Sequence, residues 1–339
     1  MLRLRLPTVG FFLVVTLATL LGLLLAGPPA AAQDRSSVSL LLENDSFGGS
    51  DRHYTNGLKA SWLSRKDQFT DFSHWLARAL PLFPETGERR VGFAIGQNMY
   101  TPTDIAATTL QTEDQPYAGW LYGEVGLVSK TDDRHDAVSI SIGVIGPASQ
   151  AENAQKFWHD TFGFSEPKGW DNQLENEPAL NLTYMHSRRF FKEDLPLFGL
   201  DADVIPHAGV SLGNVFTYAA AGLTLRLGDD FKGDFSGPDR IRPSMPGAVH
   251  FEPPGGLFGW YVFAGVEGRA MARNIFLDGN TFTDSHSVDR KLWVGDAQIG
   301  LALIFRRFRI TYTQVLRTIE FDGQDHPHNF GALSLTANF

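Results

Sequence analysis

Alternation of apolar and polar residues along short segments is the feature that most constrains the fold of this chain. In Ala137–Ile145, for example, the apolar residues at every second position from Val138 to Val144 are separated by Ser or Gly. A period of two places successive side chains on opposite faces of a β-strand. We expect strands at Ser37–Asp45, Asn56–Ser64, Arg90–Asn98, Gly119–Ser129, Ala137–Ile145, Leu180–Tyr184, Asp201–Leu212, Val215–Leu227, Gly259–Leu277, Asp296–Leu303, Arg309–Thr313 and His328–Phe339. The count is about twelve, and Gly259–Leu277 is open between one long strand and two. The Gly/Pro-rich, charged stretch Gly228–Gly256 is predicted to be a long extracellular loop.

The chain's last segment indicates what kind of sheet these strands build. Leu333, Leu335, Ala337 and Phe339 alternate with polar residues, and ending on an aromatic residue is similar to the closing strands of bacterial outer-membrane barrels. Strands of about ten residues with one apolar face are typical of a lipid-facing barrel with a polar interior. A soluble β-sandwich would not need an apolar outer face on nearly every strand. We therefore predict an all-β fold, a transmembrane antiparallel β-barrel of about 12 strands in one domain.

The N-terminal segment predicts export. Arg3 and Arg5 precede an apolar run from Phe11 to Ala26, and small residues then lead to a cleavage site before Gln33. A retained anchor is the alternative, because the run approaches the roughly 20 residues that a spanning helix needs. The Ala-rich ending and the lack of a stop-transfer charge cluster favour cleavage. The sequence thus predicts a signal peptide at 1–32 and an outer-membrane barrel at 33–339.

Composition excludes several classes of site and partner. The chain has no Cys, so it has no disulfide framework, thiolate metal site or thiol nucleophile. Its formal net charge is −9, and removing Arg3 and Arg5 leaves 27 basic against 38 acidic residues, or −11. Such an acidic chain is a poor nucleic-acid binder. An anionic substrate would need local Lys or Arg, or a bridging divalent cation.

Three residues with oxygen-bearing side chains stand together at the end of the first predicted strand: Glu43, Asn44 and Asp45. These side chains suit a hard cation such as Ca²⁺, which prefers oxygen ligands. In a regular strand Asn44 and Asp45 point to opposite faces, so both serve one site only if the strand ends or bulges there. A hairpin with a polar turn is the alternative interpretation.

One segment interrupts the β pattern with a predicted helix. Ser149 to Glu152 reads as a capping box, and the helical stretch continues to Phe162 and ends at Gly163. Gln155 and His159, at i and i+4, lie on one helix face. The His is a candidate general base, although a single His on a loop helix is also compatible with a purely structural role.

Five stretches together resemble the outer-membrane lipid A deacylase family. They are ENDSFGGSDRHYTNGL, QNMYTP at Gln97–Pro102, PYAGWLY at Pro116–Tyr122, VIGPASQAENAQKFWH at Val144–His159 and KGWDNQL at Lys168–Leu174. They lie in order over nearly the whole chain after the predicted signal peptide. The resemblance implies a twelve-stranded barrel with its active site between barrel wall and helix, facing the outer leaflet. It also implies calcium-dependent hydrolysis of the 3′-linked acyloxyacyl ester of lipid A, similar to the chemistry of secreted phospholipases.

The resemblance also implies roles for residues at matching positions. The family's Asn-Asp pair falls on Asn44 and Asp45, its threonine on Thr55, and its Gln-x-x-x-His on Gln155 and His159. A further family acid has no clean match, and its nearest equivalent in this chain is Glu166.

The chain departs from the family pattern where some members carry basic residues that meet substrate phosphate. Thr101–Gln115 contains no Lys or Arg. Arg52, Lys168 or Arg188–Arg189 are the alternatives for that role.

These observations lead to one hypothesis and two alternatives. We expect Asp45 and Asn44, with Glu43, turn carbonyls or water, to bind Ca²⁺, and His159 to activate water for attack on the ester while Gln155 holds substrate or orients water. The substrate would be lipid A of lipopolysaccharide in the outer leaflet, among the outer-membrane lipids. A serine-type outer-membrane phospholipase and a non-catalytic porin or structural barrel are the alternatives.

Overall fold

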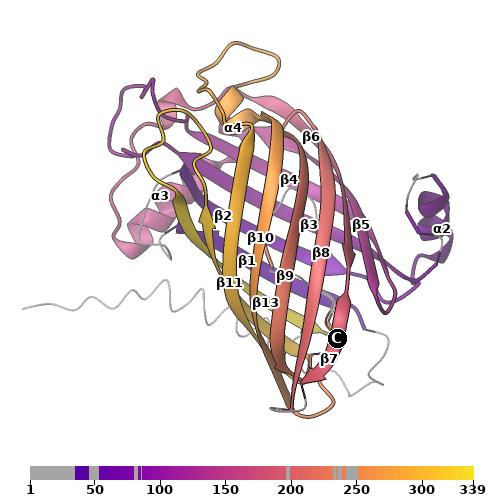
Figure 1. Ribbon diagram of the computed structural model, residues 1–339. Coiled ribbons are helices and arrows are strands. Elements are labelled where there is room, and N and C mark those ends of the chain that lie inside the picture. The colour runs from indigo at the N-terminus through magenta and orange to yellow at the C-terminus, as the bar shows by residue number, and fades with distance from the viewer. Residues whose placement is uncertain are drawn as a thin grey trace, which may run out of the picture.

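The computed structural model describes residues 35–45, 53–79, 83–84, 86–195, 199–231, 234, 239–241 and 251–339. The predicted signal peptide and Arg52 lie outside these ranges. One antiparallel sheet winds into a barrel (Figure 1). The elements are β1 Ser37–Asn44, β2 His53–Leu63, α2 Thr70–Ala79, β3 Glu88–Thr101, β4 Ala118–Lys130, β5 Arg134–Ile145, the 3₁₀ turn η2 Pro147–Ser149, α3 Ala151–Phe162, the 3₁₀ turn η3 Trp170–Asn172, β6 Glu177–Arg188, β7 Phe190–Leu195, β8 Leu200–Gly213, β9 Phe216–Asp229, β10 Phe258–Asn274, α4 Ile275–Asp278, β11 Trp293–Phe305, β12 Phe308–Arg317 and β13 His328–Asn338.

The sheet closes into twelve barrel positions, as the sequence predicts. β1 pairs with β13, and β6 pairs with β8, which completes the ring. β7 pairs with β8 immediately beyond β6, so β6 and β7 form one strand interrupted at Arg189. At the seam, Ser36 N donates to Phe339 O at 3.1 Å and Phe339 N donates to Ser36 O at 2.9 Å. Closure leaves no sheet edge to be satisfied in lipid.

The period-two patterning sorts side chains between the outer wall and the lumen. Outward positions carry exposed apolar side chains on most strands, including Ile95, Ile142, Leu212 and Ile299. In water such a band would be unfavourable, whereas in a bilayer it contacts lipid. The segment Gly259–Leu277 is resolved as one strand, β10, followed by the short helix α4. Within the described ranges, no helix is both long enough and apolar enough to cross a membrane.

The two ends of the barrel differ in their connections. At the end where Phe339 lies, residues 131–133 join β4 to β5 and residues 306–307 join β11 to β12. At the opposite end the connection between β5 and β6 contains α3. Outer-membrane barrels have short periplasmic turns and longer extracellular loops. The α3 end is therefore the extracellular end.

Two long connections nevertheless leave from the periplasmic end. The first, between β2 and β3, contains α2, a helix that the sequence analysis did not predict. Leu76 and Ala77 of α2 pack with Val91 of β3 and Leu127 of β4, on the outer wall (Figure 1). The helix therefore covers part of the barrel wall at its periplasmic rim.

The second is the β9–β10 connection, predicted as an extracellular loop over Gly228–Gly256. That prediction is wrong for the residues that the structure describes. The connection leaves β9 at the periplasmic end, and six of its described residues lie buried in the lumen: Phe231, Asp234, Asp239, Arg240, Ile241 and Phe251. Arg309 of β12 holds the segment there with ion pairs of 2.6 Å to Asp234 and 2.9 Å to Asp239. Buried charges need such pairing, because an unpaired charge in a low-dielectric interior is strongly unfavourable.

Candidate active site

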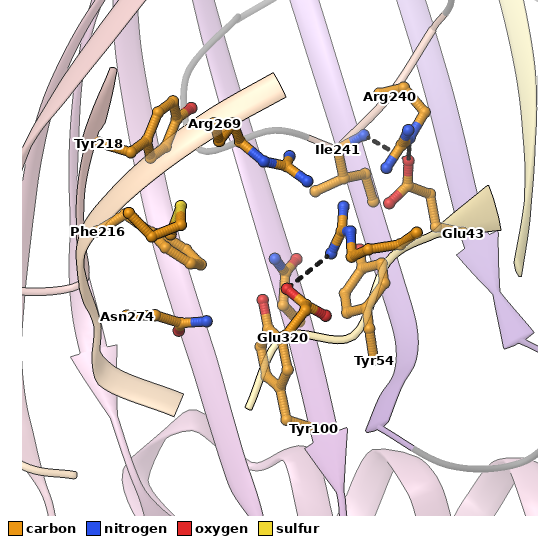
Figure 2. Close-up of a pocket in the computed structure, with 13 residues that line it drawn as sticks. Glu43, Tyr54, Tyr100, Phe216, Tyr218, Arg240, Ile241, Arg269, Asn274 and Glu320 are labelled. Atoms are coloured by element: carbon orange, nitrogen blue, oxygen red, sulfur yellow. Dashed lines mark hydrogen bonds and ion pairs between the residues drawn. The ribbon is translucent and has the colours of Figure 1, made fainter. Parts of the chain in front are cut away.

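The end of β1 sends neighbouring side chains to opposite sides of the wall. Glu43 points into the lumen, where its Oε1 accepts from Arg240 Nε at 2.8 Å and from Ile241 N at 2.9 Å (Figure 2). Asn44 is the last residue of the strand and alternates with Glu43, so it belongs to the outer face with Leu42. The structure therefore does not bring Glu43 to Asn44. Its ion pair with Arg240 argues against the predicted role as a calcium ligand.

A bulge in β2 turns Thr55 toward Asn44. The register with β3 shifts between Tyr54 and Asn56, so Tyr54 faces the lumen while Thr55 faces outward. Asn44 Nδ2 donates to Thr55 O at 3.2 Å, and the hydroxyls of Thr55 and Thr101 are 2.7 Å apart. Bulges commonly re-aim side chains beside active sites. Asp45 follows β1 directly and is fully buried. The outer wall thus carries a polar row across β1, β2 and β3.

Helix α3 is close to the predicted segment, but its cap differs. It runs from Ala151 to Phe162 and ends at Gly163, whose φ of 75° is the left-handed conformation expected at a helix C-terminus. Ser149 belongs instead to η2, and Gln150 precedes the helix without a side-chain cap hydrogen bond. The capping-box prediction is therefore wrong. The residue chemistry suited a box, but the left-handed conformation of Gln150 shifts the helix start.

Close packing places α3 against the outer wall beside that polar row. Ala151 and Trp170 form a buried cluster with Met99 of β3, which lies two residues before Thr101 and so on the same face. Gly119 of β4 lies beneath the start of the helix, where an added Cβ would stand 2.3 Å from the Cβ of Ala151. The glycine therefore permits an approach that a side chain would block. In Figure 1, α3 lies outside the strands at the extracellular end.

The two predicted functional side chains of α3 are buried and oriented. Gln155 is 2 % exposed, and its Oε1 accepts from Trp170 Nε1 at 2.8 Å. That bond leaves the Gln155 amide nitrogen as a donor, with no hydrogen-bond partner among the described residues. His159 is 4 % exposed, and its Nδ1 contacts the carbonyl oxygen of Ser165. A carbonyl only accepts, so Nδ1 carries the proton and Nε2 of the neutral ring is the basic nitrogen.

The structure narrows the choice of basic residue for an anionic substrate. Arg188 and Arg189 lie at the periplasmic end, in ion pairs with Asp133 and Asp203, so they cannot serve a site at α3. Lys168 is exposed on the α3–β6 connection, on the same side as the helix. Glu166 is likewise exposed there.

Lys156 is a cation that the sequence analysis missed. It follows Gln155 on α3, and its Nζ is 2.6 Å from Glu152 Oε1. Its hydrogen bond to Glu152 raises the pKa of Lys156. The sequence does indicate this cation, because Lys156 lies three residues before His159 on the same predicted helix.

The donor set at the end of β1 fits a hard cation in chemical type. Asp45 offers a buried carboxylate, and Asn44 offers an amide oxygen, because its nitrogen is directed to Thr55. In the parts of the chain that the structure describes, no group of three or more His, Asp or Glu residues is arranged to hold a metal. Ca²⁺ also accepts amide and backbone carbonyl oxygens and water, so two such side chains can form part of its shell.

Comparisons with known proteins agree with this architecture. The model of the family described as "Outer membrane protein LpxR" matches residues 13–339. LpxR from Salmonella typhimurium is 23% identical and superposes with a TM-score of 0.73, covering 89% of this chain and 100% of that one. The β domain of the Bordetella autotransporter BrkA is 10% identical over 91% of this chain and 100% of its own, and its TM-score of 0.42 carries no argument. None of the curated proteins matches. On the family match, the chain belongs to the LpxR family of outer membrane proteins.

Proposed function

We propose that this protein is a lipid A 3′-O-deacylase, which hydrolyses the ester of the 3′-linked acyloxyacyl group with the aid of Ca²⁺. Membership of the LpxR family supports an outer-membrane enzyme that modifies lipid A. The observation that carries the proposal is the fixed orientation of His159, whose Nε2 is held as a base on a helix packed against the outer wall.

The chain's own residues divide the work of ester hydrolysis. His159 Nε2 takes a proton from water as the water attacks the ester carbonyl, and later gives it to the leaving alcohol. The Gln155 amide, held by Trp170, donates to the substrate or to the attacking water. Asn44 and Asp45 would hold Ca²⁺, which polarises a carbonyl and stabilises the charge that develops on its oxygen.

The position of the site suits a substrate that stays in the membrane. Helix α3, which carries Gln155 and His159, lies on the outer side of the wall at the extracellular end, the level of the outer leaflet. Lipopolysaccharide can therefore present its ester to the site while its acyl chains remain among lipids. Among the described residues, Lys156 and Lys168, rather than Arg188 and Arg189, are then the candidates for contact with a substrate phosphate.

The proposal is tested by incubating the purified protein with lipopolysaccharide and Ca²⁺ and analysing lipid A by mass spectrometry. We expect loss of the mass of one acyloxyacyl group from the 3′ position, no loss in EDTA, and recovery when Ca²⁺ is restored. A chelator-insensitive reaction would reject the role of calcium. Unchanged lipid A at every Ca²⁺ concentration would reject the function.

Two observations weigh against the alternatives. Among the described residues, no serine hydroxyl is hydrogen-bonded to His159 Nε2, the nitrogen that meets the nucleophile in a serine hydrolase. The lumen is crossed by the β9–β10 connection and its ion pairs to Arg309, which does not suit a porin. Labelling by a serine-directed fluorophosphonate would support the first alternative, and a large single-channel conductance would support the second.

A further inference from the structure

The β9–β10 connection reaches through the lumen to the back of the wall that carries the candidate active site. Its residues Arg240 and Ile241 both contact Glu43, whose carboxylate is fully buried. Glu43 is directly followed by Asn44, which belongs to the outer face, and then by Asp45. The β9–β10 connection therefore starts at the periplasmic end and contacts β1 near its extracellular end, next to the candidate site.

Several contacts hold Arg240 in place. Its guanidinium lies 3.5 Å from Asp296 of β11 and over the ring of Phe330 of β13, 4.8 Å from the centroid. The arginine side chain is 2 % exposed. Figure 2 shows Arg240 and Ile241 approaching Glu43 from inside the barrel. The ion pair between Arg240 and Glu43 is thus stabilised by contacts with β11 and β13.

The wall is shaped to receive this segment. Ile241 packs with Leu41 of β1 and Ala332 of β13. Gly57 of β2 is the cross-strand partner of Glu43, and a Cβ there would lie 2.8 Å from Ile241 Cδ1. Glycine inside a strand often marks a place where another part of the chain approaches closely. Three features of the wall, a carboxylate, an apolar patch and a glycine, therefore fit Arg240 and Ile241.

We propose that Glu43 and Arg240 are positioning residues for the active site: the β9–β10 connection fixes the end of β1 from inside the barrel. On the outer side, Asn44 ends its strand and bonds to Thr55, which lies in a bulge. The ion pair on the lumen side adds a restraint one residue away from Asn44. This proposal rests on the proposed function for its catalytic readout, although the positional effect itself does not.

The test compares two buried luminal carboxylates. Glu43→Ala removes the partner of Arg240, and Glu124→Ala removes the partner of Lys59, which lies 3.1 Å from it. Both carboxylates are 0 % exposed in the lumen, so each variant removes one buried acid from a buried cation, and Arg240 keeps its 3.5 Å contact with Asp296. We expect similar losses of heat resistance. Only Glu43→Ala should lower kcat, by roughly 10- to 100-fold, because a misplacement of about 1 Å in an active site has that effect.

Two gentler variants keep the test decisive if Glu43→Ala does not fold. Glu43→Gln retains an acceptor for Ile241 N and should restore most of kcat. Arg240→Lys keeps the charge but loses the guanidinium geometry, and should raise the Ca²⁺ concentration for half-maximal activity several-fold with little change in KM. Equal kcat values for the Glu43 and Glu124 variants would overturn the proposal.

Hydrogen exchange separates this proposal from the proposed function. In detergent, the amides of residues 42–45 should exchange at least several-fold faster in Glu43→Ala than in Glu124→Ala. That comparison holds even if the wild-type protein releases no acyl group, a result that would reject the proposed function alone. Equal exchange at these amides would reject the positioning role.

Discussion

Gly119→Ala should disable the enzyme without disturbing the barrel. The new Cβ would stand 2.1 Å from Ser149 Oγ and 2.3 Å from the Cβ of Ala151. The serine hydroxyl can rotate away, but the Ala151 Cβ moves only with the backbone of α3. Carbon atoms pack at about 3.5 Å, so the start of the helix must retreat by about 1 Å. Because α3 carries Gln155 and His159, a shift of that size should lower kcat about 100-fold.

A matched control lies on the same strand and the same face. An added Cβ at Gly123 meets nothing within 4 Å, so Gly123→Ala should leave activity unchanged and should not destabilise the strand. Both variants are assayed for acyl release from lipopolysaccharide, and heat-modifiable migration on gels reports barrel assembly. Full activity of Gly119→Ala, with assembly like that of wild type, would refute the idea that close docking of α3 sets the catalytic geometry.

Three other perturbations address separate parts of the reasoning. His159→Asn keeps hydrogen-bonding capacity but cannot act as a base, so acyl release should fall by roughly 10²- to 10⁴-fold while calorimetry still detects Ca²⁺ binding; a near-normal rate would make His159 structural. Asp45→Ala should abolish Ca²⁺ binding and activity but preserve heat-modifiable migration, and unchanged calcium affinity would remove Asp45 from the ligand set. Deletion of Phe339 removes both hydrogen bonds to Ser36 at the barrel seam, so less folded protein should reach the outer membrane, as measured by fractionation; normal assembly would show that closure does not need this residue.

Strand positions could be predicted from sequence because a lipid-facing barrel has a simple rule. Each strand must alternate between lipid and lumen, so segments such as Ala137–Ile145 carry their own signal. The α3 helix was also recognisable, since Gly163 ends it and its polar residues recur at helical spacing. By contrast, α2 lies on the outer wall at the periplasmic rim, where barrels usually have short turns, and nothing in the alternation indicates it.

The β9–β10 connection shows where this rule fails. Gly, Pro and charged residues in Gly228–Gly256 are typical of an exposed loop and predict one. In the barrel, the same charges find opposite charges on lumen-facing strand positions, as Asp234 and Asp239 do at Arg309. Pairing between distant segments decides burial here. Local composition cannot reveal it.

The make-up of the candidate site depends on the side of the sheet to which each single side chain points. Glu43, Asn44 and Asp45 look equivalent in sequence, as three adjacent oxygen donors. The strand sends Glu43 into the lumen and Asn44 to the wall, and the residue that joins Asn44 is Thr55, eleven positions later, through a bulge in the next strand. One short stretch thereby faces two environments. On the lumen side Glu43 bonds to the β9–β10 connection, and on the outer side Asn44 belongs to the candidate site. A substitution on one side should therefore alter the position of residues on the other.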